Sequence, residues 1–386
     1  MQKYDYIITG TGASGLMLIH HLISDSYFDQ KQILMIDKQT KDLNDRTWCF
    51  WEKDIGIWDK ILIKKWNNIY FGSDWFSKKI DISPYQYKMI RSKEFYRFVF
   101  NEVQMKSNVT IVQEEVLDIK DEGNIVKVET DQKNYLGDKV FNSIIFSSAY
   151  KEQMKYPVLN QHFIGWFIKT SEPVFDTTMA TFMDFTVEQK GNTRFMYILP
   201  ISETEALFEY TLFSEALLKE KEYEDEIIKY LQEREITQYE ITEKEKGCIP
   251  MTCYDFRKHN SKNIIHLGTA GGWTKPSTGF TFSLTSKKIQ KLTNYLKKSS
   301  DLSQFGKRTK FWYYDLLFID LLYKKNHIGA SLFSKLFERN KVTKILKFLD
   351  EESTLLEDVQ ITTSLPALNF LKMLWVRISG KFSKAN

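Results

Sequence analysis

The chain of 386 residues is long enough for about two domains with large cores, and its 42% hydrophobic and 15% aromatic residues exclude a disordered protein. Three cysteines give no disulfide framework, six histidines lack the spacing of a metal site, and P-loop and serine-hydrolase motifs are absent. Because the charged residues Lys3 and Asp5 lead directly into the first strand and no long uncharged apolar stretch follows, we expect no signal peptide and no spanning helix. The composition predicts a globular cytoplasmic protein with no bound metal and a net charge of +4.

The first forty residues predict a strand, a helix and a second strand that together could hold a dinucleotide. An apolar strand over 4–9 precedes the sequence GTGASG at 10–15, and an apolar helix follows at once. Glycines at these places allow a tight turn, close approach of backbone N–H groups to phosphate, and close packing of helix on strand. The second strand ends at Asp37, at a spacing that suits hydrogen bonds from a ribose. The cofactor residues predicted here are Gly10, Gly12, Ala13, Ser14, Gly15 and Asp37.

A segment rich in aromatic residues follows from Asp45 to Glu52. Its side chains could form a stacking wall for a flat or polyene ligand, or they could belong to a loop that packs on the core. The aromatic residues concerned are Trp48, Phe50 and Trp51. Farther along, the pattern predicts a helix over 91–103 and strands over 109–112, 125–128 and 143–146, the last buried on both faces.

From residue 161 the pattern predicts an antiparallel sheet, followed by an acidic helix over 214–235. The strands are expected over 163–169, 181–187, 193–201 and 205–213. Asp184 and Glu209 are acids within apolar strands. The pattern alone favours a solvent-facing Glu209; if its face is buried instead, desolvation would raise the pKa of the carboxyl and make it a proton donor near neutral pH. The side chain of Asp184 could likewise face either solvent or the core.

A second strand, Gly-rich loop and helix begin at an apolar strand over 263–267, with the loop over 268–279. Two such turns favour FAD over NAD, because a long dinucleotide needs one turn at the pyrophosphate and another near the flavin. A generic loop before a helix is the alternative interpretation.

The rest of the chain is predicted to be helical and basic. Between Lys287 and Asp350 there are 15 Lys or Arg and five Asp or Glu, interleaved with aromatic residues. Such helices could lie on an anionic membrane surface, with the basic side chains reaching the headgroups. A solvated basic face over a core explains the same pattern equally well. Nucleic acid fits less well, because no binding motif accompanies the charge.

Taken together, these segments resemble the lycopene β-cyclase family over nearly the whole chain. The motifs that carry the resemblance are GTGASG at 10–15, RTWCFW at 46–51, MDF at 183–185, FMYILP at 195–200, LFEYT at 207–211, GCIPM at 247–251 and the loop from Gly268 to Phe280. Their order and spacing are specific, although no single motif is decisive. The LFEYT segment matches the family's acidic FLEET-like motif, with Tyr210 in place of a second acid.

The resemblance implies an α/β plus α+β fold of the hydroxylase-type flavoproteins. A Rossmann-like FAD-binding domain is then interleaved with an antiparallel-sheet substrate domain, and a helical C-terminal region follows. The expected boundaries are 1–60, 88–160 and 251–300 for the FAD-binding domain, 61–87 and 161–250 for the substrate domain, and 301–386 for the helical region, which could contact a membrane surface.

The resemblance also implies an activity and its residues. Such proteins protonate and cyclise the ψ-ends of lycopene into β-rings, giving γ-carotene and then β-carotene, and they need FAD reduced by NADPH without net redox change. Glu209 becomes the proton donor, and Asp184 is a second catalytic candidate. The resemblance adds Arg46, Arg91, Gly268, Ala270, Pro276 and Gly279 to the cofactor residues, and Trp48, Phe50 and Trp51 become candidate substrate contacts.

As to partners, the resemblance implies an apolar carotenoid substrate, a peripheral position on the cytoplasmic inner face of a membrane, and other carotenoid-pathway enzymes nearby. The main rival is an FAD-dependent monooxygenase or reductase acting on a large apolar isoprenoid, since the same fold serves those reactions. A carotenoid- or lipid-binding flavoprotein without catalysis is a further alternative, and it predicts that Glu209→Gln leaves function intact.

Overall fold

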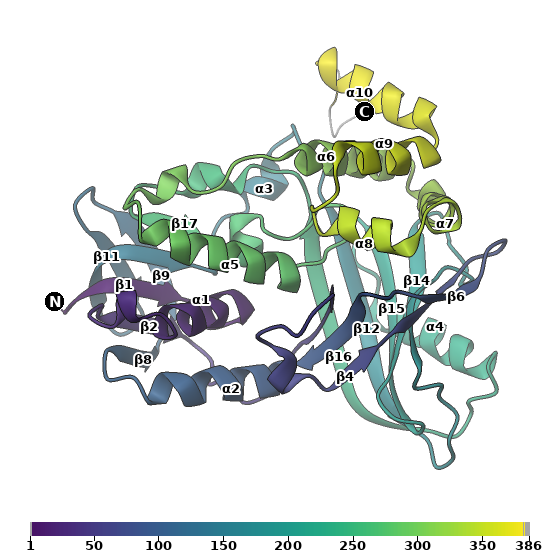
Figure 1. Cartoon of the computed structure of the whole chain (residues 1–386), viewed down its shortest axis with the longest axis horizontal. Helices are drawn as coiled ribbons and strands as arrows, with labels where there is room; N and C mark the ends of the chain where they lie inside the picture. Colours follow the sequence, from purple (N-terminus) through teal and green to yellow (C-terminus); the bar gives the residue numbers. More distant parts are fainter. Residues whose placement is uncertain (1, 381, 383–386) are drawn as a thin grey trace.

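Three β-sheets organise the protein in the computed structural model, which describes residues 2–380 and 382 (Figure 1). The first sheet contains seven strands in the order β8-β2-β1-β11-β10-β9, and β17 pairs with β11 on the same side as β10. β8, β2, β1, β11 and β17 run parallel, as expected for a dinucleotide-binding unit. The strands are β1 (Lys3–Thr9), β2 (Ile33–Asp37), β8 (Val109–Gln113), β9 (Val116–Asp121), β10 (Val126–Thr130), β11 (Asn134–Asn142) and β17 (Ile264–His266).

Three helices pack on one face of this sheet and bury a shared apolar core. They are α1 (Ala13–Ile23), α2 (Ser92–Gln104) and α5 (Phe282–Leu296). The helix predicted over 91–103 is therefore confirmed as α2. Its position follows from an amphipathic pattern, in which Phe95, Val99 and Val103 are buried on one face.

The strand predicted over 143–146 is wrong. β11 ends at Asn142, whose side chain accepts a hydrogen bond from the Ile144 N–H at 3.0 Å and donates one to the Ile144 carbonyl at 2.7 Å. These side-chain hydrogen bonds take the place of backbone hydrogen bonds between strands and turn the chain. The apolar run that follows is therefore not a strand. Ile145 and Phe146 are exposed in consequence.

The second sheet also has seven strands, in the order β16-β12-β15-β14-β13-β5-β6. Its neighbours are antiparallel except β5 and β13, so a strand from the early part of the chain completes a sheet built mainly from residues 159–251. The strands are β5 (Asn68–Gly72), β6 (Lys78–Asp81), β12 (Leu159–Lys169), β13 (Met179–Asp184), β14 (Thr193–Pro200), β15 (Glu205–Ser214) and β16 (Glu240–Met251).

A small antiparallel sheet joins the two cores. Its strands are β3 (Thr47–Glu52), β7 (Gln86–Arg91) and β4 (Lys64–Trp66), in the order β3-β7-β4. Because side chains alternate along a strand, Phe50 enters the core beneath α1 and α5, whereas Trp51 enters the core of the second sheet.

Helices cover both faces of the second sheet. α4 (Glu220–Gln232) packs on one face, and the apolar sides of the C-terminal helices pack on the other, where Figure 1 shows them together above the sheet. These helices are α6 (Lys310–Lys324), α7 (Gly329–Arg339), α8 (Val342–Leu349), α9 (Leu355–Ser364) and α10 (Ala367–Ile378). The short helices are α3 (Ala149–Glu152), η1 (Ser26–Phe28), η2 (Asp59–Ile61), η3 (Phe256–His259), η4 (Gly268–Gly271), η5 (Leu302–Gln304) and η6 (Asn326–Ile328).

The basic C-terminal stretch is largely a solvated face over a core. Its apolar residues Phe311, Ile319 and Phe333 are buried, and Tyr313 is its one large aromatic residue that is more than half exposed among the described residues. The exposed apolar residues lie farther along the chain, on α9 and α10. Within residues 2–380 and 382, no helix is long and apolar enough to cross a membrane.

Candidate functional site

The first Gly-rich turn has the geometry of a phosphate cradle. Gly10 has φ of +84°, and a Cβ at Gly15 would lie 2.1 Å from the Gly10 carbonyl, so neither place accepts a side chain easily. A Cβ at Gly12 would meet nothing within 4 Å, which leaves open space over the turn. α1 begins at Ala13 without a side-chain cap, so its first N–H groups can bind an anion.

Asp37 lies beside this turn at the end of β2. Its carboxylate accepts hydrogen bonds from the backbone N–H of Thr11 at 2.6 Å and from the Thr11 hydroxyl at 3.0 Å, and Lys41 lies 3.6 Å away. The acid therefore holds the turn in shape. Its contact with a ribose stays a prediction.

The second Gly-rich loop meets the first. A Cβ at Gly268 would lie 2.0 Å from the Ser14 hydroxyl oxygen, and one at Gly279 would lie 1.8 Å from the Gln161 Oε1 atom. That Gln161 oxygen and the Thr278 hydroxyl are buried without a hydrogen-bond partner. Unpaired buried polar groups cost free energy unless a ligand or water satisfies them. The two loops therefore fit a dinucleotide that passes from the first turn to the second.

The other residues of the second loop lie around this junction. Ala270 is buried in η4, and Pro276 is half-buried in the turn that leads to α5. α5 starts after Thr281 without a side-chain cap, so a second helix amino terminus is available to an anion. Cofactor contact at Ala270 and Pro276 stays a prediction.

The two predicted cofactor arginines lie in different surroundings. Arg91 ends β7, is buried, forms an ion pair with Glu243 and places its guanidinium 3.9 Å from the centre of the Phe167 ring. Its Nε–H has no hydrogen-bond partner. Arg46 is exposed and donates to the carbonyl of Lys246 at 3.4 Å. Arg91 is therefore the better placed of the two to face a buried ligand.

The aromatic residues of β3 do not form one wall. Trp48 and Phe50 lie against Phe282 on one face, with ring centres 5.4 and 5.1 Å away, and Trp51 lies against Phe280 on the other, at 4.7 Å. The alternation of a strand separates them, and the first residues of α5 already fill the space. Their contact with substrate stays a prediction.

Glu209 belongs to a row of residues across the second sheet. The strand registers place Tyr197 opposite Glu209, Glu209 opposite Gly165, and Gly165 opposite Glu245. Directly opposed residues share a face, so the row crosses β14, β15, β12 and β16 on the face away from α4. Two carboxyls thus flank a glycine in the middle of a sheet.

The interpretation of Glu209 as solvent-facing is wrong, because its side chain is buried, with 8% of the residue exposed. Its Oε1 atom accepts a hydrogen bond of 2.6 Å from the Thr211 hydroxyl. Burial, and then the nearby charge of Glu245, raise the pKa of Glu209 to about 8. The carboxyl is therefore protonated near neutral pH.

Glu245 is the functional candidate that sequence reasoning missed. It is 7% exposed, and its Oε2 atom accepts a hydrogen bond of 2.7 Å from the Thr47 hydroxyl. Burial raises the pKa of Glu245 as well. A Cβ at Gly165 would lie 3.3 Å from Glu245 Cγ and 3.5 Å from Glu209 Cβ, so the glycine leaves room between the acids.

Two tyrosine hydroxyls and a cysteine thiol also lie near the two acids. The hydroxyls of Tyr87 and Tyr197 are hydrogen-bonded at 2.6 Å, and the Cys49 thiol of β3 lies close to them. Burial raises the pKa of both tyrosines and of Cys49, so all three stay uncharged. Glu209 and Glu245 therefore form an acid pair that is buried among largely aromatic side chains.

The acid pair lies on the sheet face that leads to the second Gly-rich loop. Gln161, Gly165 and Phe167 share one face of β12, with Gln161 against Gly279 and Phe167 under Arg91. Gly165 is four residues from Gln161, or about 13 Å along a strand. An acid, a Gly-rich loop and a buried arginine therefore share one side of the sheet.

Comparison with known protein families gives one match, to the lycopene cyclase proteins, over residues 5–375. The chain belongs to the lycopene cyclase family. No curated protein matches it by sequence. The resemblance expected from the order of the motifs is confirmed.

Solved structures that share this fold include a flavin-dependent enzyme and a flavoprotein. A geranylgeranyl bacteriochlorophyll reductase-like protein from Thermoplasma acidophilum is 10% identical, with a TM-score of 0.60 over 97% of this chain and 99% of that one. A flavin-dependent brominase is 12% identical, with a TM-score of 0.65 over 94% and 98%. A flavoprotein/dehydrogenase from Cytophaga hutchinsonii is 10% identical, with a TM-score of 0.64 over 98% and 100%. At these identities the likeness establishes the fold, and the predicted α/β flavoprotein architecture is confirmed.

Asp184, the second candidate for a catalytic acid, lies apart from Glu209 and Glu245. Its partners are the Tyr230 hydroxyl at 2.6 Å, the Arg234 guanidinium at 3.0 Å and the Thr186 hydroxyl at 2.7 Å. Tyr230 belongs to α4, so Asp184 faces that helix and Glu209 faces away from it. The structure does not bring the two predicted catalytic acids together.

Proposed function

We propose that this chain is a lycopene cyclase that converts the ψ-ends of lycopene to β-ionone rings, through γ-carotene to β-carotene, without net redox change. The observation that carries the proposal is the buried Glu209 carboxyl, which is protonated near neutral pH on the face that leads to the second Gly-rich loop. Membership in the lycopene cyclase family supports it.

The proposed chemistry begins with a proton transfer from Glu209 to a carbon of the terminal double bond. The tertiary cation that results is attacked by the neighbouring double bond, which closes the ring. The ring cation then loses a proton, so one proton enters and one leaves and the formula is unchanged. Glu245 lies across Gly165, where its charge helps to keep the Glu209 carboxyl protonated.

The walls of the site suit a cationic intermediate. Tyr87, Tyr197 and Phe167 present aromatic rings on the same side as the acid pair, and rings stabilise a cation over their faces. The low exposure of both acids excludes bulk water, which would capture a carbocation.

FAD is the proposed cofactor and NADPH its proposed electron donor. Reduced FAD, when bound, would supply an electron-rich ring near the developing positive charge. The residues proposed to hold FAD are Gly10, Gly12, Ala13, Ser14 and Gly15 of the first turn, Asp37, Arg91, and Gly268, Ala270, Pro276 and Gly279 of the second loop.

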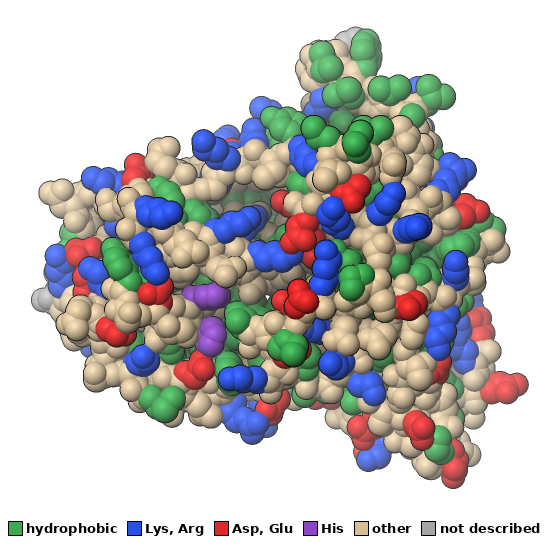
Figure 2. Space-filling model, in the orientation of Figure 1, with side chains coloured by type: hydrophobic (Ala, Val, Ile, Leu, Met, Phe, Trp, Pro, Cys, Tyr) green, Lys and Arg blue, Asp and Glu red, His purple; other side chains and the backbone are tan. Residues whose placement is uncertain are grey.

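Membrane contact is proposed through α9 and α10. Figure 2 shows hydrophobic side chains over α10 at the top of the molecule. Those that are more than half exposed recur along one side of the helix at Leu368, Leu371, Trp375 and Ile378. An apolar strip of this kind can enter the headgroup region and receive a substrate that is dissolved in lipid. The protein would then act on the cytoplasmic face, where association with other carotenoid-pathway enzymes remains a prediction.

The experiment that tests the reaction is expression in a bacterium that accumulates lycopene. We expect γ-carotene and β-carotene to replace lycopene, and Glu209→Gln to prevent this while the flavin spectrum of the purified protein stays unchanged. Persistence of lycopene with soluble, flavin-loaded wild-type protein would reject the cyclase proposal. Net NADPH consumption with an oxidised or reduced product would favour the monooxygenase or reductase alternative.

Membrane contact is tested by pelleting with anionic vesicles. We expect the wild type to pellet and the double variant L371E/W375E to remain in solution. The double variant I55E/I57E adds the same two charges at exposed apolar residues far along the chain, and it should pellet like the wild type. Equal pelleting of all three proteins would place the contact elsewhere.

A further inference from the structure

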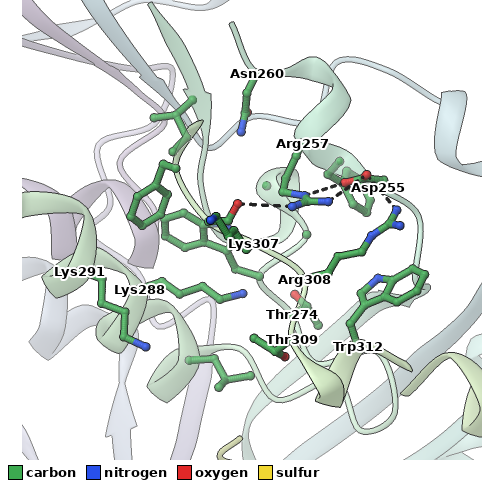
Figure 3. Close-up of a pocket in the computed structure, with 18 of the residues that line it drawn as sticks. Asp255, Arg257, Asn260, Thr274, Lys288, Lys291, Lys307, Arg308, Thr309 and Trp312 are labelled. Carbon is green, nitrogen blue, oxygen red and sulfur yellow. Dashed lines mark hydrogen bonds and ion pairs between the residues drawn. The ribbon is translucent and has the colours of Figure 1, made fainter. Parts of the chain in front are cut away.

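A cavity of about 690 Å³ lies behind the second Gly-rich loop (Figure 3). Its walls come from the segment after β16, over 252–260, from 271–276 of the loop, from α5, and from 304–312. None of the first-turn residues and neither acid of the pair lines it. Its volume falls in the range of roughly 300–1,000 Å³ that is typical of small-molecule sites.

Cationic side chains from α5 line this cavity. Lys288 and Lys291 lie on one side of α5 together with Tyr295, and Lys298 follows just after the helix ends. None of the three lysines has a carboxylate or hydrogen-bond partner for its ammonium group among the described residues. Figure 3 shows the Lys288 ammonium directed into the cavity. Burial lowers the pKa of Lys288, and the negative charge of Glu351, which also lines the cavity, opposes this shift without forming an ion pair with Lys288.

Three of the cavity's other cations are engaged in ion pairs, whereas Lys307 has no carboxylate partner among the described residues. Arg257 and Arg308 both contact Asp255, at 2.9 Å each. Lys275 contacts Asp315 at 2.9 Å. The excess positive charge therefore rests on the unpaired lysines of the lining, and a negative ligand would find its partners among Lys288, Lys291, Lys298 and Lys307.

Aromatic rings lie close to the cationic side chains of the cavity. The Lys288 ammonium lies 5.8 Å from the centre of the Trp273 ring, and the Arg308 guanidinium lies 4.1 Å from that of Trp312. Thr274 and Thr309 add hydroxyl groups to the same wall. Flat rings close to the unpaired lysines suit a ligand that combines an aromatic base with phosphate groups.

We propose that this cavity binds a phosphate-bearing nucleotide, of the class that includes NADPH. The rings favour a nucleotide over inorganic phosphate, and a lipid headgroup shares only the phosphate chemistry. The link to electron supply rests on the proposed function, but binding itself requires neither lycopene nor turnover. The loop over 271–276 is the wall that this cavity shares with the proposed flavin site, so a bound nucleotide would lie next to that site.

The test is calorimetric titration of flavin-loaded full-length protein with NADPH, without lycopene. We expect saturable one-to-one binding that weakens as salt is added, and we expect Lys288→Gln and Lys291→Gln each to weaken it by about tenfold. Lys297→Gln is the matched control, because this exposed lysine near the end of α5 contacts Asp25 outside the cavity, and its affinity should equal that of the wild type.

Three results would overturn the proposal: no binding of NADPH, equal affinity in all four proteins, or binding of anionic vesicles through Lys288 and Lys291 with no binding of NADPH. The flavin spectrum and urea midpoint of each variant, measured in parallel, identify a variant that has lost its fold. Failure of cyclisation in the pigment experiment leaves the titration unaffected, so the two proposals fail separately.

Discussion

Asp184 and Glu209 are both buried acids of the same sheet, yet their surroundings differ. Asp184 faces α4 and is held by Tyr230, Arg234 and Thr186, so its charge is fully compensated. Glu209 faces the other side, with one hydroxyl donor and a second acid as neighbour. The first arrangement ties Asp184 to the helix that packs on the sheet, and the second favours a protonated carboxyl at Glu209.

Burial alone therefore does not identify an acid catalyst, because the partners decide which protonation state burial favours. The comparison predicts that replacing Glu209 affects chemistry and spares the fold, whereas replacing Asp184 affects the fold first. Each prediction below tests one side of that contrast.

The largest effect is expected for Glu209→Gln. The amide keeps the size of the side chain but cannot donate an acid proton, so ring formation should fall by about 10²–10⁴-fold. Initial rates of γ- and β-carotene formation with reduced flavin measure this, with the urea midpoint as control. A rate within threefold of wild type would remove Glu209 from the reaction.

Asp184→Asn should destabilise the protein by about 1–3 kcal/mol, because it removes the charge that compensates Arg234 and places an amide against it. Urea unfolding measures the change. The control is Asp176→Asn, which removes an exposed carboxylate that contacts Lys79, and which should change the free energy of unfolding little. If Asp184→Asn stops cyclisation while stability is unchanged, the assignment of Asp184 to the fold is wrong.

The pH dependence of stability should also separate the two acids. Glu209 has a raised pKa in the folded protein, so its contribution to stability is fully present below the unfolded pKa near 4.5 and is lost as pH rises through about 8. Between pH 5 and 9 we expect the wild type to lose stability relative to Glu209→Gln, as followed by urea midpoints at each pH. A difference that stays constant with pH would show that Glu209 is ionised throughout.

The smallest effect is expected for Glu245→Gln. Removing the neighbouring acid eliminates one of the two causes that raise the pKa of Glu209, while burial remains. The alkaline limb of the pH–rate profile should therefore shift to lower pH, without loss of the maximum rate. Glu243→Gln, on the same strand but paired with Arg91, controls for charge on β16. An unshifted limb would mean that the two acids do not interact.

The sequence allowed the first turn and most strands to be predicted, because their determinants are local. Glycines at 10, 12 and 15 act through their own backbone, and a strand such as β15 shows its apolar run directly. The second Gly-rich loop could be predicted for the same reason, although its contact with Ser14 could not, since that contact depends on how distant strands pair.

Glu245 could not be predicted, because its burial follows from the register of three strands. The segment Glu243-Lys244-Glu245-Lys246 has the composition of an exposed strand, and β16 was not expected at all. Only pairing with β12 brings Glu245 opposite Gly165 and into the row with Glu209. A weak local signal exists, since Glu245, Gly247 and Ile249 alternate as one face of a strand would.

Infrared titration of carboxyl protonation tests the central claim most directly. The wild-type protein should show the C=O band of a protonated carboxylic acid at pH 7 that is missing in Glu209→Gln and that disappears on raising the pH with a midpoint near 8. A wild-type spectrum at pH 7 that matches that of Glu209→Gln in this band would contradict the account, because Glu209 would then already be ionised and could not supply the proton.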